Sequence, residues 1–381
     1  TIPSSMKSIG DYSFSGCILL SQVSIPSSVT KLGKSIFNGI KSLKINGNIQ
    51  IIGNKMFENC ASLNQLIIPS SIKSIGYLSF KGCSSLKQIK IPSSVTSIGD
   101  GAFRECSLLT QIVIPSFITS IGDNVFNACS SLKQITIPKS VKRIGNYTFS
   151  GCSSLTQIII PSSVTSIGDG SFSKCSKLTK ISIPSSVKSI GEGCFNECVL
   201  LSQISIPSSI TQFGKRIFNG IQSLTIVGDM QIISNEMFKN CTSLQQLIIP
   251  SSVTMIGDFA FDGCSSLKQI TIPSSVISIG VGAFRKCSSI TQISIPSSVN
   301  TINANTFDRC SLLKQIKIPS SIKAIQEYAF SKCSSLVEIT IPQSVTSFGE
   351  HTFDGCTSLK QITIPSSVTS IENSVFYGCS A

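Results

Sequence analysis

A single repeat runs through the whole chain and constrains its fold more than any other feature. Prolines recur at the interval that separates Pro69 from Pro92, and a phenylalanine follows each proline position at a constant distance, in 17 repeat units that end at Phe376. Two longer gaps between prolines, at 26–69 and 207–250, each contain a unit without proline. Because the register is kept, each column of the repeat has one fixed environment. Such a period predicts stacked units that bury a shared core, since one unit cannot bury its apolar side alone.

Residues 83–104, which read CSSLKQIKIPSSVTSIGDGAFR, illustrate the local structure that the repeat predicts. From Gln88 the chain alternates polar and apolar residues up to a proline that cannot donate a ladder hydrogen bond, which indicates a short, half-buried strand. Gly99 permits a sharp bend, and Asp100 is a candidate N-cap for about one helical turn. We therefore predict an α/β solenoid of 17 units, with a parallel β-sheet on the concave face and short helices or turns on the convex side.

The run LxxIxIPSSVTSIGxxAFxxC resembles the leucine-rich repeat, and specifically its BspA-like subclass of 23-residue, cysteine-bearing units. The resemblance covers the whole chain and implies one curved leucine-rich-repeat array over residues 1–381. Leucine-rich repeats are scaffolds whose partners differ between members. The BspA-like subclass implies adhesion to a host or matrix protein and a cell-surface or secreted location. The alternative location is the cytoplasm or the inner face of the membrane.

Two shortened units divide the repeat into larger blocks. The units at 26–45 and 207–226 are shorter than the others, share the run FNGI and are followed by closely similar sequences. We predict an internal duplication of eight-unit blocks at 26–206 and 207–381, the second of them truncated. One interpretation is duplication without functional content. The other is that a short unit changes the local curvature and that two equivalent surfaces allow bivalent binding.

The 16 cysteines predict a buried ladder of reduced thiols. Fifteen lie shortly after the repeated phenylalanine, in a column where two units instead have Ile40 and Ile221, so the site is small and apolar. Thiols stacked along neighbouring strands are poorly oriented for disulfides. The chain has no CxxC motif and one histidine, His351, so we expect no metal and no cofactor. Reduced thiols fit a reducing compartment, which keeps an intracellular regulatory scaffold as an alternative.

The sequence contains no catalytic constellation, and we predict that the protein is not an enzyme. The 18 acidic residues are dispersed, and five of them share the column after the glycine, which is typical of caps and not of paired general acids: Asp11, Asp100, Asp123, Asp169 and Asp258. The Gly-x-Gly pairs lack the remaining residues of a phosphate-binding loop. No apolar run approaches the length of a membrane span. The chain begins without Met or a leader pattern, which indicates a fragment or a processed protein.

The solvent side of the predicted sheet is the candidate binding surface. The fourth column before the proline is Gln in twelve units, whereas the second column before it varies and includes aliphatic residues. The net charge of +13 and the lysines near this face would attract polyanions such as acidic glycans. Nucleic acid is not expected, because the face has almost no aromatic residues to stack on bases. The candidate residues are Ile67, Lys87, Gln88, Lys90, Gln111, Val113, Gln134, Ile159, Gln246, Ile248, Lys314 and Lys317.

These observations predict a non-catalytic binding scaffold that recognises another protein through the concave sheet face. A sheet that binds a ligand would vary at its outward residues while its core stays constant. Sequence drift without selection, or a surface that only keeps the protein soluble, would give the same pattern. The competing interpretation is a structural array, coat or fibre. Such an array would assemble end to end through unpaired strand edges near Thr1 and Ala381.

Overall fold

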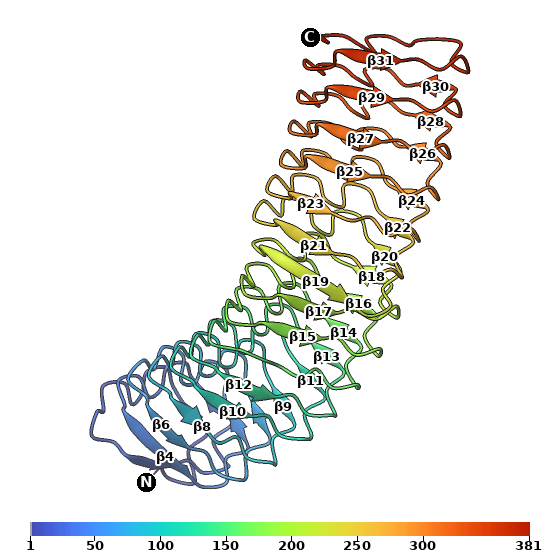
Figure 1. Ribbon diagram of the computed structural model, residues 1–381. Helices are drawn as coiled ribbons and strands as arrows, with labels where there is room; N and C mark the ends of the chain where they lie inside the picture. Colours follow the sequence, from blue (N-terminus) through green and yellow to red (C-terminus); the bar gives the residue numbers. More distant parts are fainter. Residues whose placement is uncertain (1) are drawn as a thin grey trace. The chain divides into compact units, whose positions relative to one another are not determined.

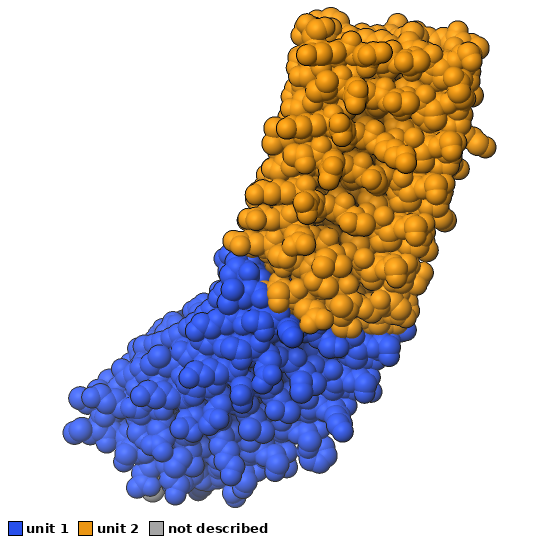
Figure 2. All heavy atoms as spheres, viewed as in Figure 1, with its two compact units in different colours: residues 1–200 blue, residues 201–381 orange. Residues whose placement is uncertain are grey.

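The computed structural model describes residues 2–381, and within this range it contains 31 β-strands and no helix. The chain divides into an N-terminal unit, residues 1–200, and a C-terminal unit, residues 201–381 (Figure 2). In each unit, short strands form two stacks (Figure 1). We call the stack before the proline column the first ladder and the stack before the glycine column the second ladder. Thr1, near which end-to-end assembly was predicted, lies outside the described residues.

In the N-terminal unit the paired strands are parallel, and each strand aligns with the same positions of the next repeat. Gln111 lies opposite Gln134 in the first ladder, and Ser166 lies opposite Ser189 in the second. The first-ladder strands are β2 (Gln22–Ser24), β4 (Ser42–Asn46), β6 (Gln65–Ile67), β8 (Gln88–Ile89), β10 (Gln111–Val113), β12 (Gln134–Thr136) and β15 (Lys180–Ser182). The second-ladder strands are β1 (Ser8–Ile9), β3 (Lys31–Leu32), β5 (Ile51–Ile52), β7 (Ser74–Ile75), β9 (Ser97–Ile98), β11 (Ser120–Ile121), β13 (Arg143–Ile144), β14 (Ser166–Ile167) and β16 (Ser189–Ile190).

The C-terminal unit has the same construction. Gln292 lies opposite Gln315 in the first ladder, and Met255 lies opposite Ser278 in the second. The first-ladder strands are β17 (Gln203–Ser205), β19 (Ser223–Val227), β21 (Gln246–Ile248), β23 (Gln269–Ile270), β25 (Gln292–Ser294), β27 (Gln315–Lys317), β29 (Glu338–Thr340) and β31 (Gln361–Thr363). The second-ladder strands are β18 (Gln212–Phe213), β20 (Ile232–Ile233), β22 (Met255–Ile256), β24 (Ser278–Ile279), β26 (Thr301–Ile302), β28 (Ala324–Ile325) and β30 (Ser347–Phe348).

The parallel-strand solenoid predicted from the repeat is confirmed, but the count of 17 turns is not supported. The described residues form about 15 turns that carry a first-ladder strand. One reason lies at residues 156–160, where Ile158 and Ile160 are buried as in a strand but the backbone does not form one. The second-ladder strands were also missed. Each is two residues long, and the surrounding run, such as Val95 to Ile98, lacks the alternation of a strand.

The sequence predicted short helices or turns after the glycine column, and residues 2–381 contain turns there and no helix. Where a helical turn was expected, Gly101 and Glu105 have φ angles of 62° and 64°, in the left-handed region that a right-handed helix excludes. The N–H groups of Gly101, Phe103 and Glu105 bond instead to carbonyl oxygens of the next repeat, over 2.7 to 2.9 Å. These residues form a row of stacked turns, because their backbone donors bond between repeats and not along a helix.

A continuous row of phenylalanine rings fills the core of each unit, as the sequence predicts. Phe80, Phe103 and Phe126 are fully buried in the N-terminal unit, and the centroids of neighbouring rings lie 5.2 and 5.7 Å apart. Phe284 and Phe307 stack in the same way in the C-terminal unit, with centroids 5.7 Å apart. The rings are nearly parallel, at 5 to 8° for these pairs. Offset stacking of this kind stabilises a pair by about 0.5–1.5 kcal/mol beyond its area burial.

The cysteines form a second buried row beside the rings, and the predicted burial is confirmed for all of them except Cys17 and Cys379. Most of these thiols bond to the preceding repeat: the Cys83 S–H, for example, donates to the carbonyl oxygen of Phe57 at 3.1 Å. That oxygen also accepts the N–H of Cys60 at 3.1 Å, so both of its lone pairs are used. A cysteine is therefore favoured over alanine here, because its weak donor satisfies a buried carbonyl group.

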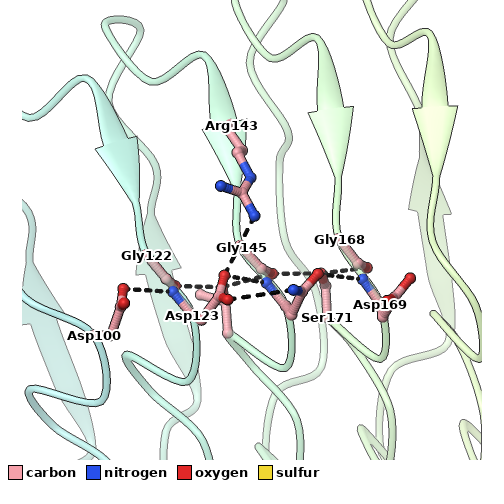
Figure 3. Close-up of polar contacts among 10 residues, drawn as sticks. Asp100, Gly122, Asp123, Arg143, Gly145, Gly168, Asp169 and Ser171 are labelled. Atoms are coloured by element: carbon pink, nitrogen blue, oxygen red, sulfur yellow. Dashed lines mark hydrogen bonds and ion pairs between the residues drawn. The ribbon is translucent and has the colours of Figure 1, made fainter.

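The aspartates after the glycine column are not helix caps, and this prediction is also wrong. The Asp100 carboxylate accepts the N–H of Asp123 in the next repeat at 2.9 Å, and the Asp123 carboxylate accepts the N–H of Asn146 at 2.8 Å (Figure 3). The glycine column lies directly over these side chains. A Cβ at Gly145 would lie 2.6 Å from Asp123 Oδ1 and 2.7 Å from the Asp123 nitrogen. Glycine is required where one repeat passes this closely over the carboxylate of the last.

Candidate binding surface

The first ladder turns alternate side chains toward the core and toward solvent. In β10, Ile112 is 4% exposed, whereas Gln111 and Val113 on either side of it point outward. All twelve side chains predicted for the binding face are exposed. Eight of them, from Ile67 to Ile159, belong to the N-terminal unit and four, from Gln246 to Lys317, to the C-terminal unit. Their exposure is as predicted, and their part in binding stays a prediction.

A row of aliphatic side chains marks this face in the N-terminal unit. Ile67 on β6 is 49% exposed, Val113 on β10 is 75% exposed and Ile159 is 83% exposed. The three are each two repeats apart, and Lys90 and Thr136 occupy the same column in between. Two strand spacings are about 10 Å, so the three aliphatic side chains form an evenly spaced row above a fixed core.

Between β23 and β29, the same face of the C-terminal unit is hollowed and polar. A hollow of about 830 Å³ lies over β23, β25, β27 and β29. Two columns of outward-facing side chains line it. One column consists of amides and one acid, and the other of hydroxyls and one lysine. The lining side chains of these columns are Gln269, Gln292, Gln315 and Glu338, and then Thr271, Ser294, Lys317 and Thr340.

Four lysines place positive charge at and around the hollow. Lys317 lines it, and Lys268, Lys314 and Lys360 are exposed immediately before β23, β27 and β31. Among residues 2–381, no carboxylate forms an ion pair with any of these four ammonium groups. Unpaired lysines at a hollow lined by amides and hydroxyls attract an anionic ligand that is also rich in hydrogen-bonding groups.

The hollow was not foreseen, although the sequence held a signal for it. Ser294 and Thr340 line it, and they occupy the positions equivalent to Val113 and Ile159, two exposed aliphatic residues of the first block. Glu338 likewise replaces the glutamine at Gln157. A position-by-position comparison of the two predicted blocks would have separated a polar face from an aliphatic one.

Within the part of the chain that the structure describes, no group of three or more His, Cys, Asp or Glu side chains could hold a metal ion. Burial raises the pKa of the thiols of Cys60 and Cys129 to about 12, so these thiols stay protonated and unreactive near neutral pH. Among residues 2–381 there is also no helix long and apolar enough to cross a bilayer.

The stacked parallel strands and their ring and thiol rows define the class of protein as a solenoid repeat protein. Six overlapping matches to the family described as "BspA type Leucine rich repeat region (6 copies)" cover residues 1–109, 38–155, 97–225, 144–268, 220–337 and 254–381. The chain therefore belongs to the BspA-type leucine-rich repeat family. This confirms the resemblance drawn from the sequence.

The chain is also similar to solved structures. A leucine-rich repeat protein from Bacteroides ovatus is 32% identical, with a TM-score of 0.52 over 98% of this chain and 80% of that one. A leucine-rich cell surface protein from Faecalibacterium prausnitzii is 30% identical, with a TM-score of 0.38 over 93% and 82% of the two chains. No curated protein sequence matches this chain. Leucine-rich repeat proteins are generally non-catalytic scaffolds, and no enzyme family is indicated.

Proposed function

We propose that this chain is a non-catalytic binding scaffold that recognises another protein through its concave first-ladder face. The observation that carries the proposal is the row of exposed aliphatic side chains at Ile67, Val113 and Ile159, on the solvent side of a fully built core. Single exposed aliphatic residues are normal on protein surfaces. These three differ because they occupy one column at even spacing, which suits a complementary protein surface.

Among residues 2–381, no part of the chain covers this row of aliphatic side chains. Burying an aliphatic side chain that now faces water contributes about 1.5–3 kcal/mol. Val113 and Ile159, at 75% and 83% exposed, would gain most of this amount in a complex and gain little from folding. Apolar anchors surrounded by polar side chains are the usual centres of protein interfaces. Lys90 and Thr136 supply such polar neighbours in the same column.

We further propose that the scaffold works at the cell surface or in the surrounding medium and binds a host or matrix protein, as the BspA-type family implies. The reduced thiols do not argue against this location. A cysteine such as Cys106 is fully buried and bonded to the carbonyl oxygen of Phe80, so it cannot reach an oxidant or a second thiol from solvent.

The test is a binding screen of the immobilised chain against purified extracellular-matrix and plasma proteins, with a variant designed from the chain itself. Val113→Ser with Ile159→Thr gives the N-terminal unit the residues of Ser294 and Thr340. We expect this double variant to lose about 10-fold or more in affinity, as for truncated apolar anchors. The control is Ile277→Ser, which removes an aliphatic side chain 60% exposed outside the first-ladder face. Binding that survives the double variant, or is lost equally in the control, contradicts the proposal.

A further inference from the structure

We propose that the hollow of the C-terminal unit binds an extended acidic polysaccharide that carries one carboxylate on every second sugar. This site is separate from the aliphatic row that we assign to a protein partner. The inference does not depend on that assignment. It is carried by the lining of the hollow, by the spacing of the lysines beside it and by the residues that lie between those lysines.

The lysines beside the hollow recur at every second repeat. Backbone hydrogen bonds fix their register: the N–H of Lys314 donates to the Thr291 oxygen at 2.9 Å, and the N–H of Lys360 donates to the Val337 oxygen at 3.1 Å. Lys268, Lys314 and Lys360 therefore share one column with a neutral residue between each pair. Neighbouring strands are about 4.8 Å apart, so the ammonium groups stand at intervals of about 10 Å along the ladder.

An extended β-linked chain of hexoses matches this spacing. Each sugar advances by nearly one strand spacing, and successive sugars are turned over, so alternate sugars present the same edge. A carboxylate on every second sugar then recurs on one side of the chain at the interval of Lys268, Lys314 and Lys360. An extended acidic peptide does not match, because its residues rise by about 3.3 Å and same-side carboxylates recur at about 6.6 Å.

The residues between the lysines suit the uncharged sugars. At β25 the intervening column residue is Thr291, followed by Gln292, and at β29 it is Val337, followed by Glu338. Val337 is 43% exposed and offers an apolar contact for the C–H face of a sugar, while Glu338 accepts hydrogen bonds from hydroxyl groups. Glu338 is the one carboxylate that lines the hollow, and it falls opposite a sugar without charge.

The lining favours a polyhydroxyl ligand over a nucleic acid. Gln269, Gln292 and Gln315 repeat once per strand, and each side-chain amide both donates and accepts, as a row of sugar hydroxyls requires. The hollow contains no aromatic side chain on which a base could stack. A strand of nucleic acid would also place Glu338 among phosphates.

The test measures binding of a hyaluronan hexasaccharide, which carries three carboxylates on alternate sugars, by titration calorimetry at low and high salt. The decisive variant is Thr291→Lys with Lys314→Thr, which keeps the net charge and breaks the every-second-repeat spacing. We expect it to lose about 5- to 10-fold in affinity. This corresponds to the loss of one partly exposed ion pair and to a lysine placed opposite the wrong sugar. Lys268→Thr with Lys314→Thr and Lys360→Thr should lose about 100-fold.

Two controls and one reserve variant complete the design. Lys142→Thr with Lys188→Thr removes two exposed lysines of the N-terminal unit, also two repeats apart but beside the second ladder, and should leave the affinity unchanged. Neutral chitohexaose, of equal length, should bind at least 10-fold more weakly than the hyaluronan probe, because it lacks the charges. If the exchange variant unfolds at a lower temperature than the wild type, the single-site variant Lys314→Gln takes its place. Equal affinity of the exchange variant, equal binding of chitohexaose, loss in the N-terminal control or no hyaluronan binding would each overturn the proposal.

Discussion

The two predicted blocks of the chain have the same core and different faces. Ile112 in β10 and Ile293 in β25 occupy equivalent positions of the two blocks and are 4% and 5% exposed. The next residue outward is Val113 in one and Ser294 in the other. A buried position keeps its apolar side chain because a change there creates a cavity, whereas an outward position of the same strand changes with little cost to folding. The face is therefore free to acquire a ligand in each unit separately.

One bend beside the second ladder differs between the blocks at two positions that contact each other. In the N-terminal unit, Asp123 accepts the N–H of Asn146, and Gly145 passes over it. The equivalents in the C-terminal unit are Ala304 and Gln326. Gln326 Oε1 there accepts the N–H of Ala304 at 3.1 Å. At this one bend the first block uses a carboxylate from the preceding repeat and the second block an amide from the following one, so a glycine is needed at position 145 but not at position 326.

The largest expected effect is alkaline unfolding of both units through their shared thiol row. Burial raises the pKa of Cys129 in one unit and of Cys310 in the other. The folded state holds these protons more tightly, so the stabilisation is complete below the unfolded pKa of about 8.5 and is lost as pH rises through the folded pKa. Each thiol then costs about 1.4 kcal/mol per pH unit. Circular dichroism should show cooperative loss of structure between about pH 9 and 11.

A cysteine variant separates this effect from titration of lysine and tyrosine. Cys129→Ala should be less stable at neutral pH, because it removes the bond to the Phe103 carbonyl group. Its free energy of unfolding should nevertheless fall less steeply with pH, because unfolding releases about one proton fewer. An alkaline transition that keeps its slope in this variant would show that the thiols do not cause it.

The next effect compares equivalent rings in the two units. Phe126 and Phe307 are both fully buried, and each stacks on a ring in both adjacent repeats, with centroids 5.4 to 5.7 Å apart. Phe126→Ala and Phe307→Ala should each lower the free energy of unfolding by about 3–5 kcal/mol. Urea denaturation of both variants checks the shared core. Native-like stability of one of them would show that the two cores are not equivalent.

A smaller effect tests the linked difference at the bend. Gly145→Gln, which copies Gln326, should destabilise the N-terminal unit by about 1–3 kcal/mol, because its Cβ would meet Asp123 Oδ1 and the Asp123 nitrogen. Adding Asp123→Ala, which copies Ala304, should restore part of this loss. A double-mutant cycle by thermal denaturation measures the coupling. Simple additivity of the two changes would show that the glycine and the carboxylate are independent.

Much of this structure follows from the repeat pattern, and the parts that do not have identifiable reasons. Alternation before the proline gave the first ladder and its outward face, and the phenylalanine and cysteine columns gave the core. The spacing of Ala102, Phe103 and Cys106 imitates a helix, yet the N–H of Phe103 bonds to the next repeat, and the N–H groups of Ala102 and Cys106 bond to carbonyl oxygens three residues back, as in turns. Left-handed positions such as Leu78 carry no glycine to mark them. The aspartates act between repeats, which a pattern within one repeat cannot reveal. The hollow depends on differences between blocks.

The smallest expected effect on stability belongs to the faces themselves. Exchanging the outward residues, as Val113→Ser with Ile159→Thr in one variant and Ser294→Val with Thr340→Ile in another, should change the free energy of unfolding by no more than about 0.5 kcal/mol, because these side chains face water. Urea denaturation of each variant against the wild type measures this. The two exchanges should affect binding in different ways. The first should weaken a protein partner alone, while the second should weaken the acidic oligosaccharide by filling the hollow with branched aliphatic groups. A loss of stability comparable with the ring variants would mean that the face belongs to the core, and the two blocks would then not have diverged at their surface alone.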